Sequence, residues 1–257
     1  MNGRLWLIGG TSDSATIAKV LGANSLPFVV TVTTTTARTL YADRVEIVIG
    51  CMDRQTMQSF CHQNQITLVV DASHPYAVEV SSQAIATAAK LNIPYLRYER
   101  VHCHAAVETD SIIELDSFDR LLTNKYLENQ RVLLTVGCKA LPRFASWQSK
   151  ATLFARILPK ITSLSTAIAA GFTSDRLIAI RPPLSIATET ALWQQWNISL
   201  VVTKASGLAG GEDIKRQVAA DLNVPLVIIT RPQIAYPQQT SNIEEVLAFS
   251  LERIGDR

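Results

Sequence analysis

The chain has 257 residues, 47% of them hydrophobic, and a formal net charge of +2. This length allows one large domain or two modest ones, and the nearly balanced charge, without basic or acidic runs, argues against nucleic acid as a partner. The longest apolar runs, such as residues 225–229, are strand-sized and far short of the roughly 18 residues of a membrane span. A signal-peptide pattern is also lacking, so we expect a cytoplasmic protein that does not bind membranes.

In the first half, short apolar runs alternate with segments of helical periodicity. This rhythm predicts a parallel sheet with crossover helices. The expected strands are residues 5–8, 29–33, 46–49, 68–71 and 95–97, and the expected helices are 14–21, 54–63 and 78–91.

The second half repeats the rhythm. Two such sheets predict an α/β fold of two Rossmann-like domains, residues 1–100 and 101–257, with a hinge near 98–106. Ligands of open α/β sheets bind beyond the carboxyl ends of the strands, so the loops after strands are the candidate sites. The expected strands are 112–115, 132–135, 152–157, 177–180, 200–203 and 226–229, and the expected helices are 118–126, 163–170, 188–196, 213–222 and 242–254.

The loop after the first strand holds Gly9, Gly10, Thr11, Ser12 and Asp13. Glycines allow a ligand to approach the backbone closely, and amides at a helix N-terminus bind anions. The loop lies where a dinucleotide fingerprint would lie, although it is not G-x-G-x-x-G. These five residues are therefore candidates for binding a cofactor pyrophosphate. A purely structural alternative is that Ser12 or Asp13 caps the following helix.

The loop after the second strand is rich in threonine and contains no acid between Thr33 and Arg38. An NAD site usually has a carboxylate here for the ribose 2′-hydroxyl, whereas hydroxyls and an arginine suit a 2′-phosphate. Thr33 and Arg38 are therefore expected to favour NADPH over NADH, with NADH still possible. The alternative is a β-rich threonine run with Arg38 solvated.

The segment Asp-Ala-Ser-His-Pro-Tyr-Ala, residues 71–77, follows the fourth expected strand. Pro75 near a helix start is a common structural device, but it does not explain His74 and Tyr76 together. Histidine can bind an anion or move a proton near neutral pH, and tyrosine can stack or donate its hydroxyl. His74 and Tyr76 are the candidate catalytic residues.

Four cysteines, at positions 51, 61, 103 and 138, form no C-x-x-C pair. The cluster His102-Cys103-His104 is the one tempting metal pattern, but two histidines that share one face of a strand make a poor site alone. We expect no metal.

Several segments together resemble the precorrin-6A reductase / cobalt-precorrin-6A reductase family of corrin (vitamin B12) biosynthesis. They are GGTSDS at 9–14, DASHPYA at 71–77, IPYLRYER at 93–100, LLTVGCKAL at 133–141, ARILP at 155–159 and the Lys-x-Ser-Gly segment within 203–232. The resemblance covers nearly the whole chain. Two positions depart from the family pattern, Val101 in place of proline and Ala205 in place of a polar residue.

The resemblance implies a two-domain reductase with mainly parallel sheets and a ligand cleft between the domains. Its reaction would transfer hydride from NAD(P)H to the tetrapyrrole macrocycle of precorrin-6A, or of its cobalt form, giving precorrin-6B in cobalamin biosynthesis. Ser73 would join the residues that bind the cofactor. A tetrapyrrole carries many carboxylates, which suit cations and backbone amides. The expected substrate-binding residues are Arg97, Arg100, Lys139, Lys204, Ser206, Gly207, Gly210, Gly211 and Arg231.

Two other interpretations stay open at this stage. One is a different NADP-dependent Rossmann-type reductase, which accounts for the first half but not for the Lys-x-Ser-Gly segment. The other is a nucleotide- or tetrapyrrole-binding protein without turnover. In each case we expect a monomer or a small homo-oligomer.

Overall fold

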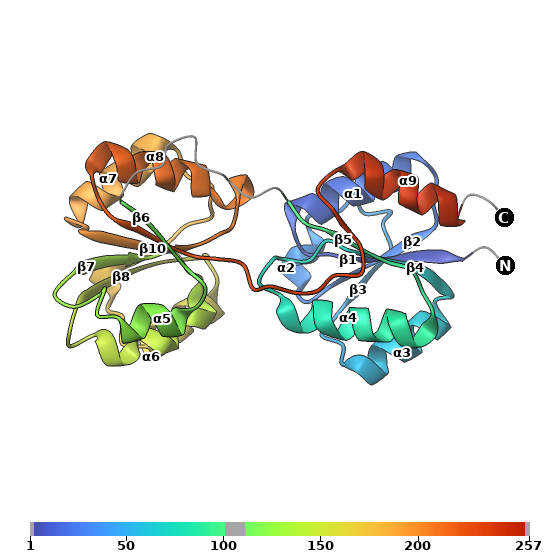
Figure 1. Ribbon diagram of the computed structural model, residues 1–257, viewed down its shortest axis with the longest axis horizontal. Helices are drawn as coiled ribbons and strands as arrows, with labels where there is room; N and C mark the ends of the chain where they lie inside the picture. The colour runs from blue at the N-terminus through green and yellow to red at the C-terminus, as the bar shows by residue number, and fades with distance from the viewer. Residues whose placement is uncertain (1–2, 101–110, 255–257) are drawn as a thin grey trace. The chain divides into compact units, whose positions relative to one another are not determined.

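The computed structural model describes residues 3–100 and 111–254. The chain divides into two compact units, one formed by Met1–Val101 together with Pro232–Arg257 and the other by His102–Arg231. Each unit is described by itself below (Figure 1). The cluster His102-Cys103-His104 and positions 101–106 of the expected hinge lie outside the described residues.

The first unit is a six-stranded parallel sheet with helices on both faces. Its strand order is β12-β5-β4-β1-β2-β3. The strands are β1 (Arg4–Ile8), β2 (Phe28–Val32), β3 (Ile47–Ile49), β4 (Ile66–Asp71), β5 (Tyr95–Tyr98) and β12 (Gln239–Thr240). The helices are α1 (Ser12–Ala23), α2 (Thr35–Arg38), α3 (Arg54–Gln63), α4 (Val78–Leu91) and α9 (Ile243–Ile254).

Alternation along β1 explains the two layers of helices. Successive side chains of a strand point to opposite faces of the sheet. Leu5 and Leu7 pack into a core with α1 and α9, whereas Trp6 and Ile8 pack into a second core with α3 and α4. Figure 1 shows these helix pairs on opposite sides of the sheet. A strand that is buried on both faces reads as a continuous apolar run, which is what β1 and β4 show.

The C-terminal segment belongs to the first unit, which differs from the expected assignment of residues 101–257 to one domain. Val246 and Phe249 of α9 are buried in the core that contains Leu5 and Leu7. The short strand β12 pairs with β5, with Gln239 opposite Arg97. A strand of two residues has no hydrophobic periodicity, so the sequence pattern did not indicate that the C-terminal segment joins the first unit.

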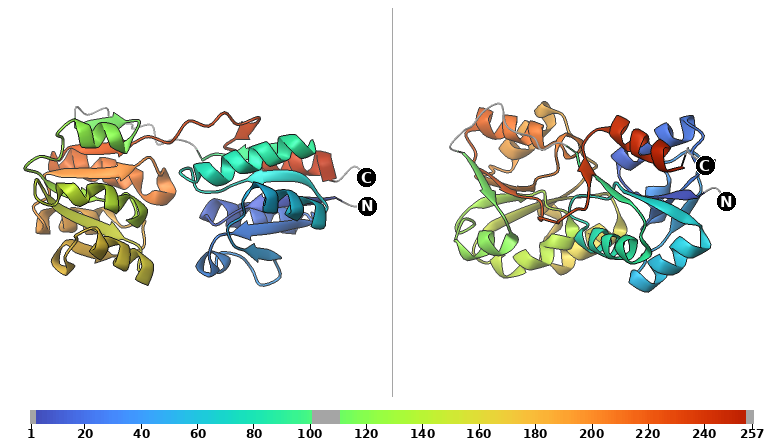
Figure 2. Two further views of the ribbon diagram at one scale, coloured as in Figure 1. Left: turned by 90° about the horizontal axis from the view of Figure 1, so that it is seen from below. Right: turned by 45° about the vertical axis from the view of Figure 1, so that its right-hand side comes forward.

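The second unit is another six-stranded parallel sheet, in the order β6-β11-β10-β7-β8-β9, again with helices on both faces (Figure 2). The strands are β6 (Ile112–Leu115), β7 (Arg131–Leu134), β8 (Thr152–Ile157), β9 (Leu177–Ala179), β10 (Leu200–Lys204) and β11 (Leu226–Ile229). The α-helices are α5 (Phe118–Thr123), α6 (Ile161–Ala169), α7 (Ile186–Gln195) and α8 (Glu212–Leu222), and the 3₁₀ helices are η1 (Cys138–Trp147), η2 (Ser174–Arg176) and η3 (Leu208–Gly210).

Both sheets have the Rossmann strand order, 3-2-1-4-5-6. In the first unit the sixth position is filled by β12, from the end of the chain, and in the second unit by β6, which precedes the other five strands. The order reverses between β1 and β4 in one unit and between β7 and β10 in the other. The expected α/β fold with two mainly parallel, Rossmann-like sheets is confirmed, and each unit has its own topological switch point.

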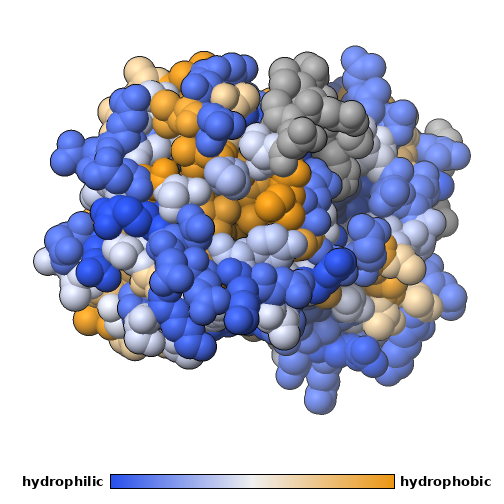
Figure 3. Space-filling model, turned by 60° about the vertical axis from the view of Figure 1, so that its left-hand side comes forward, coloured by the Kyte–Doolittle hydropathy of each residue, from blue (hydrophilic) through white to orange (hydrophobic). Residues whose placement is uncertain are grey.

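Within the described residues, no helix is long and apolar enough to cross a membrane. Hydrophobic side chains lie exposed among hydrophilic ones on the face shown in Figure 3. On α6, Ile161, Leu164 and Ile168 follow one another at helical spacing and are 85%, 45% and 58% exposed. Exposed apolar residues at this spacing are typical of surfaces that a partner covers. The expectation of a monomer or a small homo-oligomer stays a prediction.

Candidate functional site

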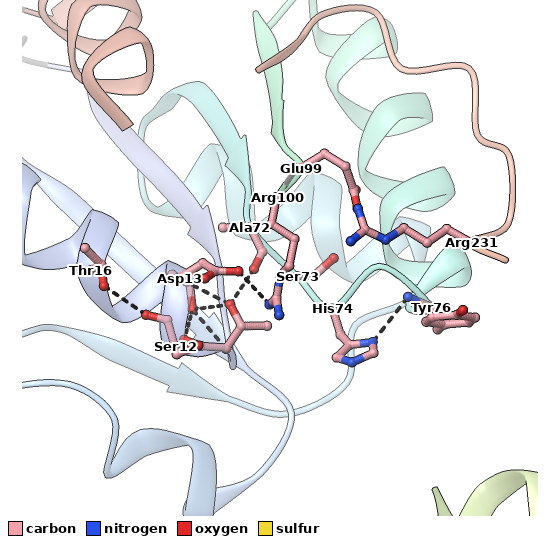
Figure 4. Close-up of polar contacts among 12 residues, drawn as sticks. Ser12, Asp13, Thr16, Ala72, Ser73, His74, Tyr76, Glu99, Arg100 and Arg231 are labelled. Atoms are coloured by element: carbon pink, nitrogen blue, oxygen red, sulfur yellow. Dashed lines mark hydrogen bonds and ion pairs between the residues drawn. The ribbon is translucent and has the colours of Figure 1, made fainter. Parts of the chain in front are cut away.

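Two loops meet at the switch point of the first unit. Residues 9–11 connect β1 to α1, and residues 72–77 connect the neighbouring strand β4 to α4. The Thr11 hydroxyl donates a 2.8 Å hydrogen bond to the Ala72 carbonyl and so joins the two loops (Figure 4). Ligands of such sheets bind in the crevice at this point, beyond the carboxyl ends of the strands.

Helix α1 is capped by Thr11, one residue before the capping alternatives that the sequence offered. The Ser14 amide donates to Thr11 Oγ1 at 3.1 Å, and the Thr11 amide donates to Ser14 Oγ at 3.0 Å, which completes a capping box. Ser12 and Asp13 therefore occupy the first turn of α1. Their amides belong to the group at a helix N-terminus that lacks partners within the helix and favours anions.

Tyr41 contacts the loop between β1 and α1 through its hydroxyl. Its hydroxyl accepts a 2.8 Å hydrogen bond from the Gly10 amide and lies 2.6 Å from Ser14 Oγ. The side chain is 9% exposed, and burial raises its pKa. Because Tyr41 already uses the Gly10 amide, an anion at this loop would bind the amides of Ser12 and Asp13 instead. The sequence did not indicate Tyr41, which lies in a turn beyond α2 without any motif.

The loop after β2 contains a short helix, whereas the structural alternative from the sequence was a β-rich threonine run. The Thr34 hydroxyl accepts from the Ala37 amide at 3.2 Å, which caps α2. Thr33 and Arg38 are exposed at the two ends of this segment. A Cβ atom added to Gly10 would have the Ala37 Cβ at 3.9 Å as its nearest neighbour, so α2 lies directly beside the glycine loop.

In the loop after β4, Pro75 is buried and His74 is exposed. The Ala77 amide donates to the His74 carbonyl at 2.7 Å, and the Tyr76 amide donates to His74 Nδ1 at 3.3 Å. The His74 and Tyr76 rings lie 5.8 Å apart (Figure 4). Because Nδ1 accepts this hydrogen bond, the neutral imidazole carries its proton on Nε2.

Arg97 is buried next to the loop that follows β4. It is 1% exposed and forms ion pairs with Asp71 at 2.9 Å and with Glu99 at 2.8 Å. The sequence predicted this arginine as a substrate ligand, but the structure uses its guanidinium inside the first unit. Arginine at the end of a buried strand suits either role, so residue type alone could not distinguish them.

Arg100 pairs with Asp13 of α1 at 2.5 Å, with 14% and 23% of the two side chains exposed. A carboxylate in the first turn of a helix is stabilised by the helix dipole, but it would repel an anionic ligand bound there. Arg100 neutralises that carboxylate. It therefore lies beside the first loop, on the side where the sequence predicted a cofactor and not a substrate (Figure 4).

At the switch point of the second unit, cations follow both strands. Lys139 is exposed in η1, just after β7, and Lys204 ends the neighbouring strand β10. The Lys204 ammonium lies 5.6 Å from the centre of the Phe118 ring. Burial lowers the pKa of Lys204, Cys138 raises it, and Lys139 lowers it, which indicates that the two lysines lie close enough to interact. Two neighbouring cations at this edge suit an anionic ligand.

The glycine-rich loop after β10 depends on glycine at several positions. A Cβ at Gly210 would lie 2.0 Å from Ser206 Oγ, and Gly211 has φ of +64°, in the left-handed region. The Gly207 amide donates to Glu212 Oε2 at 2.9 Å. This amide is therefore used within the loop, whereas the sequence predicted it as part of an anion site.

Two further residues of the second unit are buried around this loop. Arg231, expected to bind substrate, is 5% exposed, and its Nε donates to the Ala205 carbonyl at 2.9 Å. Lys215 of α8 is 1% exposed, and its ammonium donates to the carbonyls of Gly210 and Gly211 at 2.8 and 2.9 Å. Lys215 was not indicated by the sequence because lysine is rarely buried.

Lys215 gives the second unit a testable pH dependence. Burial, followed by the nearby charge of Arg156, lowers its pKa from the ordinary value of 10.5 to about 8. Below pH 8 the lysine is charged in both the folded and the unfolded chain, so the cost of burying its charge is fully present. Between pH 8 and 10.5 the unfolded chain binds more protons, so stability rises with pH.

We therefore expect the free energy of unfolding to rise, relative to a Lys215→Met variant, by an amount on the order of 3 kcal/mol across this window. Urea denaturation of both proteins at several pH values between 7 and 10.5 measures the difference. A difference that is constant with pH would mean that Lys215 keeps an ordinary pKa.

Among the described residues, no group of three or more His, Cys, Asp or Glu side chains is arranged to hold a metal ion. Several of the expected residues thus lie near the two switch points, whereas the side chains of Arg97 and Arg231 are buried. The first unit has the Gly9–Asp13 loop, Arg38, Ser73, His74, Tyr76 and Arg100, and the second unit has Lys139, Lys204 and the 206–211 loop.

Comparison with known proteins adds independent information. A family model described as "Precorrin-6x reductase CbiJ/CobK" matches residues 4–250. The chain is 44% identical to a protein named cobalt-precorrin-6A reductase from Synechocystis sp., over 95% of both chains. It is 31% identical to a protein of the same name from Priestia megaterium, over 94% of this chain and 95% of the relative.

A relative from Rhodococcus erythropolis, named precorrin-6A reductase, is 27% identical over 95% of this chain and 94% of its own. Among solved structures, one titled "CobK precorrin-6A reductase" matches with a TM-score of 0.81 and 20% identity, covering 98% of this chain and 97% of that one. This likeness shows the same fold.

Proposed function

The chain belongs to the precorrin-6x reductase family, and we propose that it reduces a precorrin-6A-type tetrapyrrole by taking hydride from a reduced nicotinamide cofactor. The observation that carries this proposal is the match of the family model to residues 4–250, together with 44% identity over 95% of a relative named cobalt-precorrin-6A reductase. The family resemblance inferred from the sequence motifs is thereby confirmed.

The first unit has the features that a dinucleotide requires. Its strand order is that of Rossmann folds, and the space above Gly10, where a Cβ would meet only Ala37 at 3.9 Å, lets a ligand approach the backbone. In our proposal, the amides of Ser12 and Asp13 bind the pyrophosphate. The bound cofactor supplies the hydride, and the protein orients the two reactants and limits access of water.

His74 and Tyr76 lie on the loop joined to the cofactor loop through Thr11 and Ala72. In our proposal, this loop positions the nicotinamide or the macrocycle, and His74 binds a carboxylate or donates a proton to the carbon that is protonated after hydride transfer. Lys139 and Lys204 of the second unit bind substrate carboxylates, because neighbouring cations recognise carboxylates well.

We further propose that the substrate contains cobalt. The more similar relatives, at 44% and 31% identity, are named cobalt-precorrin-6A reductase, whereas the Rhodococcus relative, at 27%, is named precorrin-6A reductase. The sequence left this choice open, because both substrates present the same carboxylates.

The test is turnover of purified protein under anaerobic conditions with NADPH and either cobalt-precorrin-6A or metal-free precorrin-6A. We expect the loss of NADPH absorbance at 340 nm to match the tetrapyrrole reduced, with the cobalt substrate turned over faster. Binding of NADPH without its oxidation by either substrate would instead support a non-catalytic binding protein. Faster turnover of the metal-free substrate would overturn the assignment of cobalt.

Nucleotide choice gives a separate prediction. Arg38 ends α2, beside the glycine loop, and a 2′-phosphate bound there would be paired with its guanidinium. Arg38→Ala is expected to raise the KM for NADPH by about tenfold or more and to change that for NADH by less than about twofold, since loss of a charge-assisted contact costs about 1.5–3 kcal/mol.

Lys19→Ala is the matched control, because Lys19 is an exposed cation further along α1. Steady-state kinetics with both cofactors measures the difference between the two variants. If Arg38→Ala affects NADPH and NADH equally, α2 does not recognise the 2′-phosphate.

A further inference from the structure

We propose that Asp71 and Arg97 form a buried positioning pair that sets the geometry of the loop carrying His74 and Tyr76. This inference rests on the proposed function of that loop. It replaces the expected role of Arg97 as a substrate ligand with a role that acts through other residues.

The Asp71 carboxylate is fully buried and accepts four hydrogen bonds. Oδ1 accepts from the Ser73 amide at 2.9 Å and from Arg97 Nη1 at 2.9 Å. Oδ2 accepts from Ser81 Oγ and from the Tyr95 hydroxyl, each at 2.6 Å. One oxygen thus holds the loop and its arginine, while the other is anchored to α4 and β5. Burial and the Asp71 charge raise the pKa of Tyr95, so it remains a hydroxyl donor.

The loop is tied to this pair twice through a single residue. The Ser73 amide donates to Asp71, and the Ser73 hydroxyl accepts from Arg97 Nη1 at 3.0 Å. Ser73 directly precedes His74. The backbone that leads into the catalytic candidates is therefore fixed by a carboxylate and a guanidinium that are themselves 0% and 1% exposed.

All three nitrogens of the Arg97 guanidinium contact partners inside the first unit. Its Nε and Nη2 contact Glu99 Oε2 at 2.8 Å, and the Tyr236 ring centre lies 5.3 Å from its guanidinium carbon. The guanidinium reaches Asp71, Ser73 and Glu99 with donors on three separate nitrogens in fixed directions, whereas a lysine presents its three donors from a single nitrogen. The shape of the guanidinium, and not only its charge, is what positions the loop.

This arrangement has a consequence for catalysis. A catalytic group must be held close to its productive geometry, and a misplacement of 1 Å can cost about 100-fold in rate. His74 is exposed and Pro75 is buried, so the loop presents His74 outward from a fixed base. Loosening the Asp71–Arg97 pair should move His74 and Tyr76 together while leaving both of these side chains in place.

The experiment compares Ser73→Ala and Arg97→Lys with the control Tyr95→Phe. Tyr95→Phe removes a hydrogen bond to the same carboxylate, but at Oδ2, whereas the Ser73 amide and Arg97 bind Oδ1. Amide hydrogen exchange measured by NMR at Tyr76 and Ala77 reports on the loop without any need for activity. Turnover with NADPH and the tetrapyrrole gives kcat and both KM values, and a melting curve reports global stability.

We expect Ser73→Ala and Arg97→Lys to speed exchange at Tyr76 and Ala77 by about tenfold or more relative to β1 and to lower kcat by a similar factor. Tyr95→Phe should lower the melting temperature but leave loop exchange and kcat within about twofold of wild type. If Arg97 is a substrate ligand instead, Arg97→Lys will raise only the tetrapyrrole KM and leave loop exchange unchanged.

Unchanged exchange in both loop variants overturns the positioning role, whatever their activity. The positioning role is also overturned if Tyr95→Phe speeds loop exchange as much as Ser73→Ala and Arg97→Lys do. Failure of the proposed function has a different signature, because wild-type protein would then not oxidise NADPH with either tetrapyrrole, while the exchange measurements would still decide whether the pair positions the loop.

Discussion

Replacing Gly9 with alanine is expected to weaken NADPH binding by about tenfold or more and to lower the free energy of unfolding by about 2–4 kcal/mol. A Cβ atom at this position would lie 2.3 Å from the Tyr41 hydroxyl and 2.9 Å from Val30 Cγ1. Real Cβ atoms do not approach other heavy atoms so closely, so the side chains or the loop must move.

Tyr41 cannot move without cost. Its hydroxyl is bonded to the Gly10 amide and to Ser14 Oγ, which is part of the capping box of α1. Displacing it would leave buried polar groups without partners, which costs about 1–3 kcal/mol for each group. Because the same contacts hold the start of α1, the loss of stability and the loss of cofactor affinity should occur together.

Gly22→Ala is the matched control for Gly9→Ala. Gly22 lies within α1, is exposed, and has only Phe28 Cε1, at 4.0 Å, near an added Cβ. Alanine in a helix is favoured over glycine by about 1 kcal/mol, so this variant should be slightly more stable than wild type. Urea denaturation and titration of NADPH by fluorescence measure both effects. A Gly9→Ala protein with wild-type stability and affinity would show that the contact with Tyr41 is not rigid.

The central strands of both sheets could be predicted from the sequence because they are buried on both faces. Runs such as Leu5–Ile8 and Leu226–Ile229 are continuously apolar, and their alternation with helical segments indicates parallel order. Polar residues at strand ends also placed the loops at 9–13 and 72–77 correctly at one edge. Parallel strand order and strand ends are thus local features of the sequence.

Other features depend on tertiary contacts that a local pattern does not contain. Strand β12 has two residues and pairs with β5 across more than 100 positions, so its place in the first unit could not be inferred. Arg97 and Lys215 have the residue types of ligand-binding cations, yet both are buried and satisfied by groups distant in sequence or by carbonyls. Burial of a charge is decided by the partners that the fold brings, and sequence spacing does not identify them.

The second large effect is expected at Glu189, in the second unit. Glu189 of α7 forms a buried ion pair with Arg156 of β8, and its other oxygen accepts from Trp193 Nε1 at 3.1 Å. The two charged side chains are 2% and 6% exposed. Breaking a buried pair by removing one partner costs about 3–5 kcal/mol, because a charge then stays buried without compensation. Glu189→Gln should therefore lower the free energy of unfolding by about that amount.

Arg156→Met is expected to be milder than Glu189→Gln. Lys215 interacts with both charges, since Arg156 lowers its pKa and Glu189 raises it. Without Arg156, the Glu189 carboxylate still has Lys215 as a counter-ion. Without Glu189, Arg156 and Lys215 remain as two buried cations, and Glu212 and Asp213 are the nearby acids that still compensate Lys215.

The pKa of Lys215 makes the difference measurable. Loss of the Glu189 charge should lower this pKa further, so stability should begin to rise at a lower pH than in wild type, whereas Arg156→Met should shift the rise to higher pH. Because Lys215 donates to the Gly210 and Gly211 carbonyls, these shifts also report on the base of the glycine-rich loop.

Urea denaturation followed by tryptophan fluorescence across pH 7–10.5 would compare both single variants with the double variant Arg156→Met/Glu189→Met. We expect the double variant to be closer to wild type than Glu189→Gln, because replacing both members of a buried pair with apolar groups is often nearly neutral. The contrary result would be an equal loss of unfolding free energy in the two single variants, with the rise in stability at the same pH in both. Lys215 would then not interact with the Glu189 carboxylate, and the three residues would not act as one cluster.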